Sequence, residues 1–507
     1  MPAVGDTLTS LAPVRGWWSS PYLIHLNFCI ISLTFLSSAN GFDSSLLNGL
    51  QSLPIWLSFM EQPGGKWLGF INTLYWIGAA VTATAAGWCS NRYGRKKVIW
   101  LGYLCLVIGT VLQTAAPSRA LFMVGRLLAG ASMGFMNNAG PALIAEVAYP
   151  THQGVATALF MTSYYIGSIV AAWVTFGTRT LNSDWAWRIP SLCQLLMPLL
   201  ALPGSWFISE SPRWMVSVGQ VETARQTLVK IRTDNDPNAP WVEQELHLIQ
   251  SSIQAEIEAE RSSGYAEMVR SPGNRHRLLI SVTLGFFDQW VGNGLLSYYL
   301  AIVLKSVGVT STKDQLLISA CLQIWNLLFA VGGALSVERM GRRSLFLLSA
   351  FIMLISYGIM TGLYGSFVIN GDYPTGIAFV PFVFIYFAGY DIALTPLLTS
   401  YPCEIWPFRL RSRGLTVTWM SCIIAVIFNT FVNPIALEAI GWKYYIVYVV
   451  LLICYGIIVF FFYPETRGLS LEQMSLVFDK DAPIDARSIY PEDDVVKSSA
   501  EHKQQIM

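Results

Sequence analysis

The chain has 507 residues, of which 53% are hydrophobic and 12% are charged, and its formal net charge is +1. A soluble protein carries about 25% charged residues, so this composition excludes a water-soluble fold of such length. The near-zero net charge gives no reason to expect a nucleic-acid partner. We therefore expect a polytopic protein embedded in a lipid bilayer.

Twelve apolar segments of the sequence are long enough to cross a membrane as helices, for which about 20 residues are needed. In chain order they are residues 24–49, 68–88, 98–116, 120–145, 155–177, 189–208, 277–304, 315–337, 344–367, 376–402, 414–434 and 442–463. We therefore predict an all-α membrane protein with twelve transmembrane helices.

Basic residues are concentrated in short loops at 92–97, 339–343 and 409–413. Short loops rich in arginine and lysine stay on the cytoplasmic side of a membrane, so both termini are predicted to be cytoplasmic. The one long interruption, at 209–276, is charged and compatible with amphipathic helices, which indicates a cytoplasmic linker.

Three motifs occur once in each half of the sequence, which indicates an internal duplication. The motif pairs are Arg92-Tyr-Gly-Arg95-Lys with Arg339-Met-Gly-Arg342-Arg, Ala-Glu146-Val with Cys-Glu404-Ile, and Ser-Glu210-Ser with Pro-Glu465-Thr. The predicted divisions are an N-terminal tail at 1–20, a six-helix half at 21–208, the linker at 209–276, a second six-helix half at 277–463 and a cytoplasmic C-terminal tail at 464–507. Duplicated halves around a central site are typical of alternating-access transporters.

With these motifs the sequence resembles the sugar porters of the major facilitator superfamily. Two further segments, Gln289-Trp-Val-Gly-Asn293-Gly and Thr395-Pro-Leu-Leu-Thr-Ser-Tyr401, are similar to the fungal lactose-permease-like and hexose transporter branch. The resemblance implies the major facilitator fold and secondary active transport of a sugar, with the plasma membrane as the expected location. We find no HExxH, GxSxG or phosphate-binding GxxxxGK[ST] motif, so no enzyme, cofactor or ATP-driven mechanism is expected.

Charged residues at the predicted cytoplasmic helix ends match the family's intracellular gate. They are Arg92, Arg95, Glu146, Glu210, Arg213, Arg339, Arg342, Glu404, Arg411 and Glu465. Arginine and carboxylate side chains form bidentate pairs, which in the family latch the outward-facing state, so opening toward the cytoplasm is expected to break them. The alternative is that these residues only set topology. Asn91 stands where the family has an acidic residue, so the latch in the first half is expected to be weaker or to be built around Glu146 and Glu210.

Charges inside membrane spans cost several kcal/mol unless they are paired or face a cavity. Asp43 in the first span and Arg126 in the fourth match a family pair in which the aspartate takes up a proton and releases the arginine. We therefore expect proton coupling through these two residues. A purely structural salt bridge, with uniport instead of symport, is the alternative.

The substrate side chains are predicted from helical spacing. Gln289, Asn293 and Ser297 are four residues apart and would form one polar stripe on a helix, while Asp391, Thr395 and Thr399 would form another, with Pro396 available to break that helix. The resemblance assigns sugar binding to Gln289 and Asn326, and Tyr298 is suited to stack on a sugar ring. The predicted substrate-binding residues are Gln289, Asn293, Asn326, Asp288, Tyr298, Asp391 and Thr395.

Two departures from the family leave the substrate open. Met161 replaces a sugar-binding glutamine, and Thr399 replaces a tryptophan. We expect a neutral mono- or disaccharide, because ionised Asp288 and Asp391 would repel an acidic substrate. An exporter of a small secondary metabolite remains the alternative. The cysteines occur singly, so no metal site is expected, and we expect a monomer.

Overall fold

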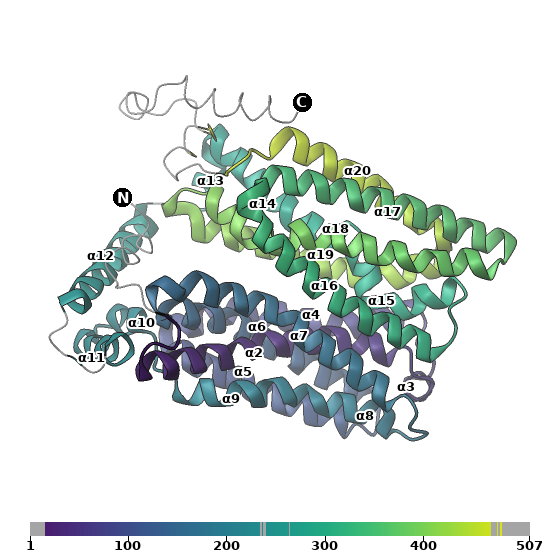
Figure 1. Cartoon of the computed structure of the whole chain (residues 1–507), viewed down its shortest axis with the longest axis horizontal. Coiled ribbons are helices and arrows are strands. Elements are labelled where there is room, and N and C mark those ends of the chain that lie inside the picture. The colour runs from purple at the N-terminus through teal and green to yellow at the C-terminus, as the bar shows by residue number, and fades with distance from the viewer. Residues whose placement is uncertain are drawn as a thin grey trace.

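The computed structural model describes residues 16–233, 236, 240–262, 264–467, 474, 477 and 478. Its elements are helices arranged as two bundles that lie side by side (Figure 1). Most of the two predicted tails lies outside the described residues.

The first bundle is built around α2, which packs against α7 and α9, and around α6, which packs against α4 and α5. Its elements are α2 (Pro21–Leu50), α3 (Pro54–Phe59), α4 (Gly65–Tyr93), α5 (Arg95–Thr114), α6 (Arg119–Val147), η1 (Pro150–His152), α7 (Gln153–Thr178), α8 (Trp185–Leu192), η2 (Cys193–Leu195) and α9 (Leu196–Phe207).

The second bundle is built around α18, which packs against α17 and α16, with α14 against α19 and α20 against α17. Its elements are α14 (Pro272–Trp290), α15 (Asn293–Ser306), α16 (Thr312–Met340), α17 (Arg342–Asn370), α18 (Tyr373–Ile405), α19 (Phe408–Ile440), η3 (Gly441–Lys443) and α20 (Tyr444–Phe462).

Four shorter helices connect the bundles: α10 (Pro212–Ser217), α11 (Val221–Arg232), α12 (Pro240–Ser262) and α13 (Glu267–Arg270). They lie at one end of the molecule, which we call the linker end (Figure 1). The opposite end, where α3 and α8 lie, is the far end. These helices occupy the predicted linker.

Ten segments of the described chain are long and apolar enough to cross a membrane, judged by length and composition. The last of them, residues 409–462, contains both α19 and α20. Neither α14 nor α15 is among the ten, because α14 carries Arg275, Arg277 and Asp288 and α15 has only 14 residues.

The predicted span 277–304 is two helices in the structure. α14 ends at Trp290, and Gly292 adopts a left-handed backbone with φ of 109° before α15 begins. Only glycine adopts such a conformation without strain. The single polar stripe predicted for Gln289, Asn293 and Ser297 is therefore wrong, because Gln289 lies before the break and the other two lie after it.

The predicted break at Pro396 is also wrong, since α18 runs without interruption through Pro381, Pro396 and Pro402. Proline removes one backbone donor, and in a membrane helix neighbouring groups can satisfy the freed carbonyls. The helix therefore keeps Asp391 and Thr395 one turn apart on one face.

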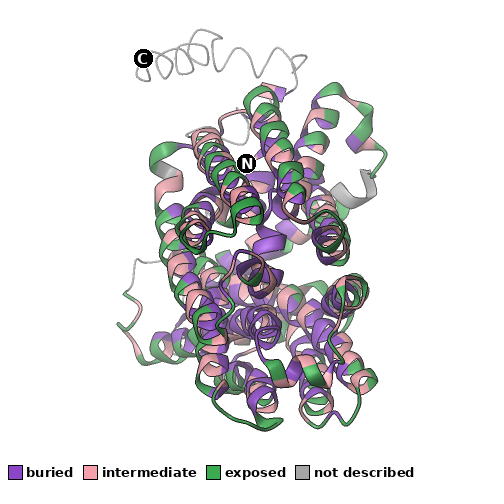
Figure 2. Cartoon of the chain, turned by 90° about the vertical axis from the view of Figure 1, so that its right-hand side faces the viewer, coloured by how far each residue is buried: buried purple, intermediate pink, exposed green. Residues whose placement is uncertain are grey.

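Buried residues fill the interior of both bundles, and exposed residues lie on the outer surface (Figure 2). Many exposed side chains are large and apolar, for example Leu335 (73%) and Ile369 (77%), as expected of a surface that faces lipid. The bundles contact each other through α4 with α19, α7 with α16, and α2 with α15.

The contact of α2 with α7 depends on small residues. A Cβ atom on Gly167 would lie 1.7 Å from the Ser38 carbonyl oxygen, and one on Gly41 would lie 1.8 Å from the Tyr164 carbonyl oxygen. The Ser38 hydroxyl donates to the Ser163 carbonyl at 2.6 Å. Close approach of this kind drives helix association where the hydrophobic effect is absent.

We expect Gly167→Ala to lower the free energy of unfolding by about 1–3 kcal/mol, because the added methyl group would force two backbones apart. Gly87→Ala is the matched control, since a Cβ there meets nothing within 4 Å. Thermal unfolding of the purified protein in detergent measures both. Equal melting temperatures for Gly167→Ala and the parent would contradict the close packing.

Candidate functional site

Seven of the predicted site residues within the spans are almost completely buried. Their exposed fractions are 2% for Asp43, 3% for Arg126, 3% for Asp288, 9% for Gln289, 6% for Asn293, 5% for Asn326 and 1% for Asp391. A buried polar group without a partner is costly, so the partners of each group indicate its role.

Asp288 is fully engaged by protein donors. Its Oδ1 accepts from the Tyr390 hydroxyl at 3.1 Å, and its Oδ2 accepts from Gln289 Nε2 at 2.8 Å and from Cys422 Sγ at 3.5 Å. The carboxylate thus orients the Gln289 amide. The structure makes Asp288 a support for Gln289, with its own acceptor atoms already occupied.

Four acceptor atoms of the predicted substrate residues have no partner in the protein. They are Oε1 of Gln289, Oδ1 of Asn293, Oδ1 of Asn326 and Oδ2 of Asp391. They come from α14, α15, α16 and α18, which all belong to the second bundle. Amide and carboxylate oxygens of this kind can accept hydrogen bonds from hydroxyl groups.

Asp391 joins the two bundles. The Tyr165 hydroxyl, on α7 of the first bundle, donates to Asp391 Oδ1 at 2.6 Å, and the Thr395 hydroxyl donates to the same oxygen at 2.9 Å. Tyr165 was not predicted from the sequence. The available signal was its position one helical turn after Met161, where the family has a sugar-binding glutamine.

Asp43 and Arg126 lie within electrostatic range of each other but form no ion pair of 4.0 Å or shorter between them. Oδ1 of Asp43 and both Nε and Nη1 of Arg126 have no hydrogen-bond partner. The Arg126 guanidinium instead lies over the Tyr75 ring, 4.9 Å from its centroid, and the Tyr75 hydroxyl donates to Asn40 Oδ1 at 2.8 Å. The structure therefore brings the predicted pair together without a direct salt bridge.

The remaining predicted substrate groups are less enclosed. Tyr298 is half-buried, and its ring meets Trp76 of the first bundle edge to face with centroids 6.2 Å apart. Thr395 is exposed, and Met161 is 44% exposed. The predicted stacking of Tyr298 on a sugar ring stays a prediction.

Hydrogen bonds between the bundles lie in the middle and at the far end. They include Tyr165 with Asp391 at 2.6 Å, the two hydroxyls of Thr73 and Thr430 at 3.2 Å, and Glu438 Oε2 accepting from the Gly65 amide at 2.7 Å. Near the same end, Gln51 Nε2 donates to the Tyr298 carbonyl at 3.0 Å. The far end of the molecule is therefore tied together.

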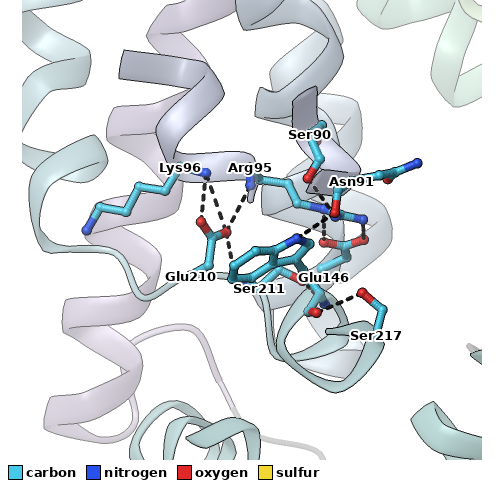
Figure 3. Close-up of polar contacts among 9 residues, drawn as sticks. Ser90, Asn91, Arg95, Lys96, Glu146, Glu210, Ser211 and Ser217 are labelled. Carbon is cyan, nitrogen blue, oxygen red and sulfur yellow. Dashed lines mark hydrogen bonds and ion pairs between the residues drawn. The ribbon is translucent and has the colours of Figure 1, made fainter. Parts of the chain in front are cut away.

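At the linker end of the first bundle, the predicted gate residues form a compact corner (Figure 3). Arg95 Nη2 donates to Glu146 Oε1 at 3.0 Å, and Arg95 Nε lies 2.9 Å from Oε2. Glu210 accepts from the backbone amides of Arg95 and Lys96 at 3.2 Å and 3.1 Å. A carboxylate at this position satisfies free amides and complements the dipole at the N-terminus of α5.

The second bundle repeats this corner with equivalent residues. Arg342 donates to Glu404 from Nε at 3.1 Å and from Nη2 at 2.8 Å. Glu465 accepts from the backbone amides of Arg342 and Arg343 at 2.8 Å and 3.1 Å. The duplicated motifs thus build the same structure twice.

Each corner lies within one bundle, so the pairs do not join the two halves directly. A rigid rotation of the bundles would leave both pairs intact, which differs from the expectation that opening breaks them. Arg92 and Arg339 are exposed, while Nε and Nη2 of Arg411 have no hydrogen-bond partner. Arg213 pairs with Glu256 of α12.

The linker residues of α10, α11 and α12 are held to the first bundle, whereas α13 packs against α14 of the second. Arg232 and Glu245 form an ion pair at 3.0 Å in which both side chains are 3% exposed, and Arg232 Nη1 donates to the Val147 carbonyl at the end of α6 at 2.6 Å. Trp214 Nε1 donates to the Asn91 carbonyl at 2.9 Å. Position 91 therefore contributes its backbone where the family supplies an acidic side chain.

Comparison with known proteins gives a consistent result. Residues 29–478 match the family described as "Sugar (and other) transporter". The chain is 30% identical over 445 residues to the MFS-type transporter oryC of Aspergillus oryzae, covering 86% of this chain and 82% of that one. It is 29% identical over 421 residues to the sugar transporter STL1 of Saccharomyces cerevisiae, covering 81% and 72%. Its fold is similar to the inward-open xylose transporter XylE of E. coli, with a TM-score of 0.73, 21% identity and coverage of 89% and 99%.

We expect Arg342→Lys to lower the free energy of unfolding by about 1–3 kcal/mol, because lysine keeps the charge but loses the planar fork that meets Glu404. Arg339→Lys makes the same change at an exposed position and serves as the control. Thermal unfolding in detergent distinguishes them. If both variants have the same melting temperature as the parent protein, the pairing of Arg342 with Glu404 contributes nothing to stability.

Proposed function

This chain belongs to the sugar (and other) transporter family of the major facilitator superfamily, and we propose that it carries a neutral sugar across the membrane by alternating access. The family consists of transporters and not of enzymes. The observation that carries the proposal is the set of buried, unpartnered acceptor atoms on α14, α15, α16 and α18 in a chain of this family. STL1, a relative, is described as a sugar transporter, which supports the substrate class.

Gln289, Asn293 and Asn326 are proposed to accept hydrogen bonds from sugar hydroxyls through their unpartnered amide oxygens. Asp391 Oδ2 supplies a fourth acceptor, while Oδ1 of the same carboxylate accepts from Tyr165. A sugar offers many donors in a small volume, which matches a set of acceptors. A carboxylated sugar would meet repulsion from Asp391.

Asp43 and Arg126 are proposed to couple transport to protons. Asp43 is buried and not paired directly, so protonation there changes the net charge beside Arg126 and alters what that guanidinium contacts. The contact of Arg126 with Tyr75 gives the arginine a position away from the aspartate. Uniport without proton coupling is the alternative.

The proposed topology has twelve crossings, with α14 and α15 together forming the seventh and with α19 and α20 as the last two. The linker end, with its basic loops, is assigned to the cytoplasm, and the proposed boundaries of the two halves are 21–208 and 277–463. The contacts at the far end then correspond to a conformation that is closed on the outer side. We also propose that the protein resides in the plasma membrane and that it is a monomer.

Export of a small secondary metabolite is the second candidate. It is favoured by the relative oryC, which is described only as an MFS-type transporter, and by the loss of two family sugar ligands at Met161 and Thr399. A measurement of sugar uptake, described next, separates the two candidates.

We expect uptake of at least one sugar in cells that lack their own sugar transporters, tested with labelled glucose, xylose, maltose and lactose at acidic and neutral external pH. Proton symport predicts faster uptake at acidic pH, because the inward proton gradient is then larger. Uptake that does not change with pH would indicate uniport. No uptake of any of the four sugars would favour the exporter.

In Asp43→Asn we expect accumulation against a gradient to be lost while exchange of internal for external sugar is retained, because asparagine cannot take up a proton. Asp314→Asn makes the same chemical change at an exposed residue and should accumulate sugar like the parent. Full uphill accumulation in Asp43→Asn would rule out its role in coupling.

A further inference from the structure

The break between α14 and α15 leaves backbone carbonyls without their usual helical donors. The last four carbonyls of a helix have no partner within it, and here the turn adds the Val291 carbonyl in the middle of an apolar protein. The Gly292 carbonyl accepts the first backbone hydrogen bond of α15, from the Leu296 amide at 3.4 Å, and keeps one further acceptor position. Such a break is tolerated within a membrane only where neighbouring groups satisfy the backbone.

Four side chains from three other helices provide these partners. Asn429 donates to the Gln289 carbonyl at 2.9 Å, Tyr386 to the Val291 carbonyl at 3.2 Å, and Tyr357 to the Gly292 carbonyl at 3.1 Å. Tyr390 shares its one hydroxyl proton between the Asp288 carbonyl and Asp288 Oδ1, each at 3.1 Å. They come from α17 (Tyr357), α18 (Tyr386 and Tyr390) and α19 (Asn429). Together they surround the break, and we call them the capping set.

The broken segment is shaped to admit this set. A Cβ atom on Gly292 would lie 2.4 Å from the Tyr357 ring, and one on Gly294 would lie 2.1 Å from Asn429 Oδ1. Tyr357, Tyr386 and Asn429 are each 0% exposed. The absence of a side chain at Gly292 and Gly294 therefore leaves room for Tyr357 and Asn429, and at Gly292 it also permits the left-handed turn.

The capping set lies directly behind two proposed sugar ligands. Gln289 is on α14 before the break and Asn293 is the first residue of α15 after it. In a continuous helix the two would share one face, so their relative placement is decided by the geometry of the break. Both present an unpartnered amide oxygen.

We propose that Tyr357, Tyr386, Tyr390 and Asn429 are positioning residues that set the placement of Gln289 relative to Asn293 and so determine substrate affinity. They act through the backbone carbonyls of the break and do not touch the substrate themselves. This inference rests on the proposed transport function for its effect on affinity, while its effect on the backbone is independent of any substrate.

The test uses the double variant Tyr357→Phe/Tyr386→Phe in the full-length protein, which removes two hydroxyl groups and keeps both rings. Each lost hydrogen bond changes an equilibrium by about two- to tenfold. We therefore expect amide hydrogen exchange of residues 291–297 to accelerate by about tenfold, and KM for the best-transported of the four labelled sugars to rise by a similar factor. The maximal rate should change by less than about twofold.

The control is Tyr445→Phe/Tyr455→Phe. These two tyrosines are also buried in the second bundle, and their hydroxyls have no hydrogen-bond partner. The control removes the same atoms without uncapping a carbonyl, so exchange and KM should match the parent. Equal exchange and equal KM in the two double variants would overturn the proposal.

The outcomes separate this inference from the proposed function. If the parent transports none of the sugars, the proposed function fails, but hydrogen exchange still tests whether the capping set holds the break. Unchanged exchange with normal sugar uptake would refute the capping set alone. A fall in maximal rate and melting temperature with unchanged KM would indicate a merely structural role, which also contradicts the proposal.

Discussion

A polar group surrounded by apolar material must find a partner, and this constraint determines most of the structure. The carbonyls at the break between α14 and α15 are capped by side chains, and Asp288 has a donor on each carboxylate oxygen. The free amides at the start of α5 and α17 are met by Glu210 and Glu465. Buried polar atoms without a partner occur in several parts of the described chain, and four of them are acceptors on the predicted substrate residues of α14, α15, α16 and α18.

The sequence predicted contacts between charged motif residues, but it did not predict how the buried polar residues are held. The duplicated motifs indicated the contacts of Arg95 with Glu146 and of Arg342 with Glu404, since opposite charges recurred at matching positions. The break at Gly292 was not predicted, because its partners come from α17, α18 and α19, at least 65 residues away in the chain. Tyr165 was missed for the same reason, since its link to Asp391 spans 226 residues. Local spacing carries no information on such contacts.

The two bundles are alike at the linker end and different in the middle. Each bundle has the same corner at its linker end, in which an arginine pairs with a glutamate and a second carboxylate accepts from backbone amides. This corner holds neighbouring helix ends together. In the middle, α2 is a single helix of 30 residues, whereas its counterpart is divided into α14 and α15. Asp43 and Arg126 lie in the first bundle and the unpartnered amides in the second. The proposed proton and sugar sites are thus in different bundles, and the hydrogen bond of Tyr165 with Asp391 crosses the interface between those bundles.

The buried pair of Arg232 and Glu245 has a consequence for synthesis of the chain. The three groups involved, Arg232, Glu245 and the Val147 carbonyl, all precede α14 in the chain and so leave the ribosome before any helix of the second bundle. Domains generally fold in the order in which they are made. The linker helices α11 and α12 can therefore pack on the end of α6, with the Val147 carbonyl and both charges satisfied. This can happen before any helix of the second bundle reaches the insertion machinery.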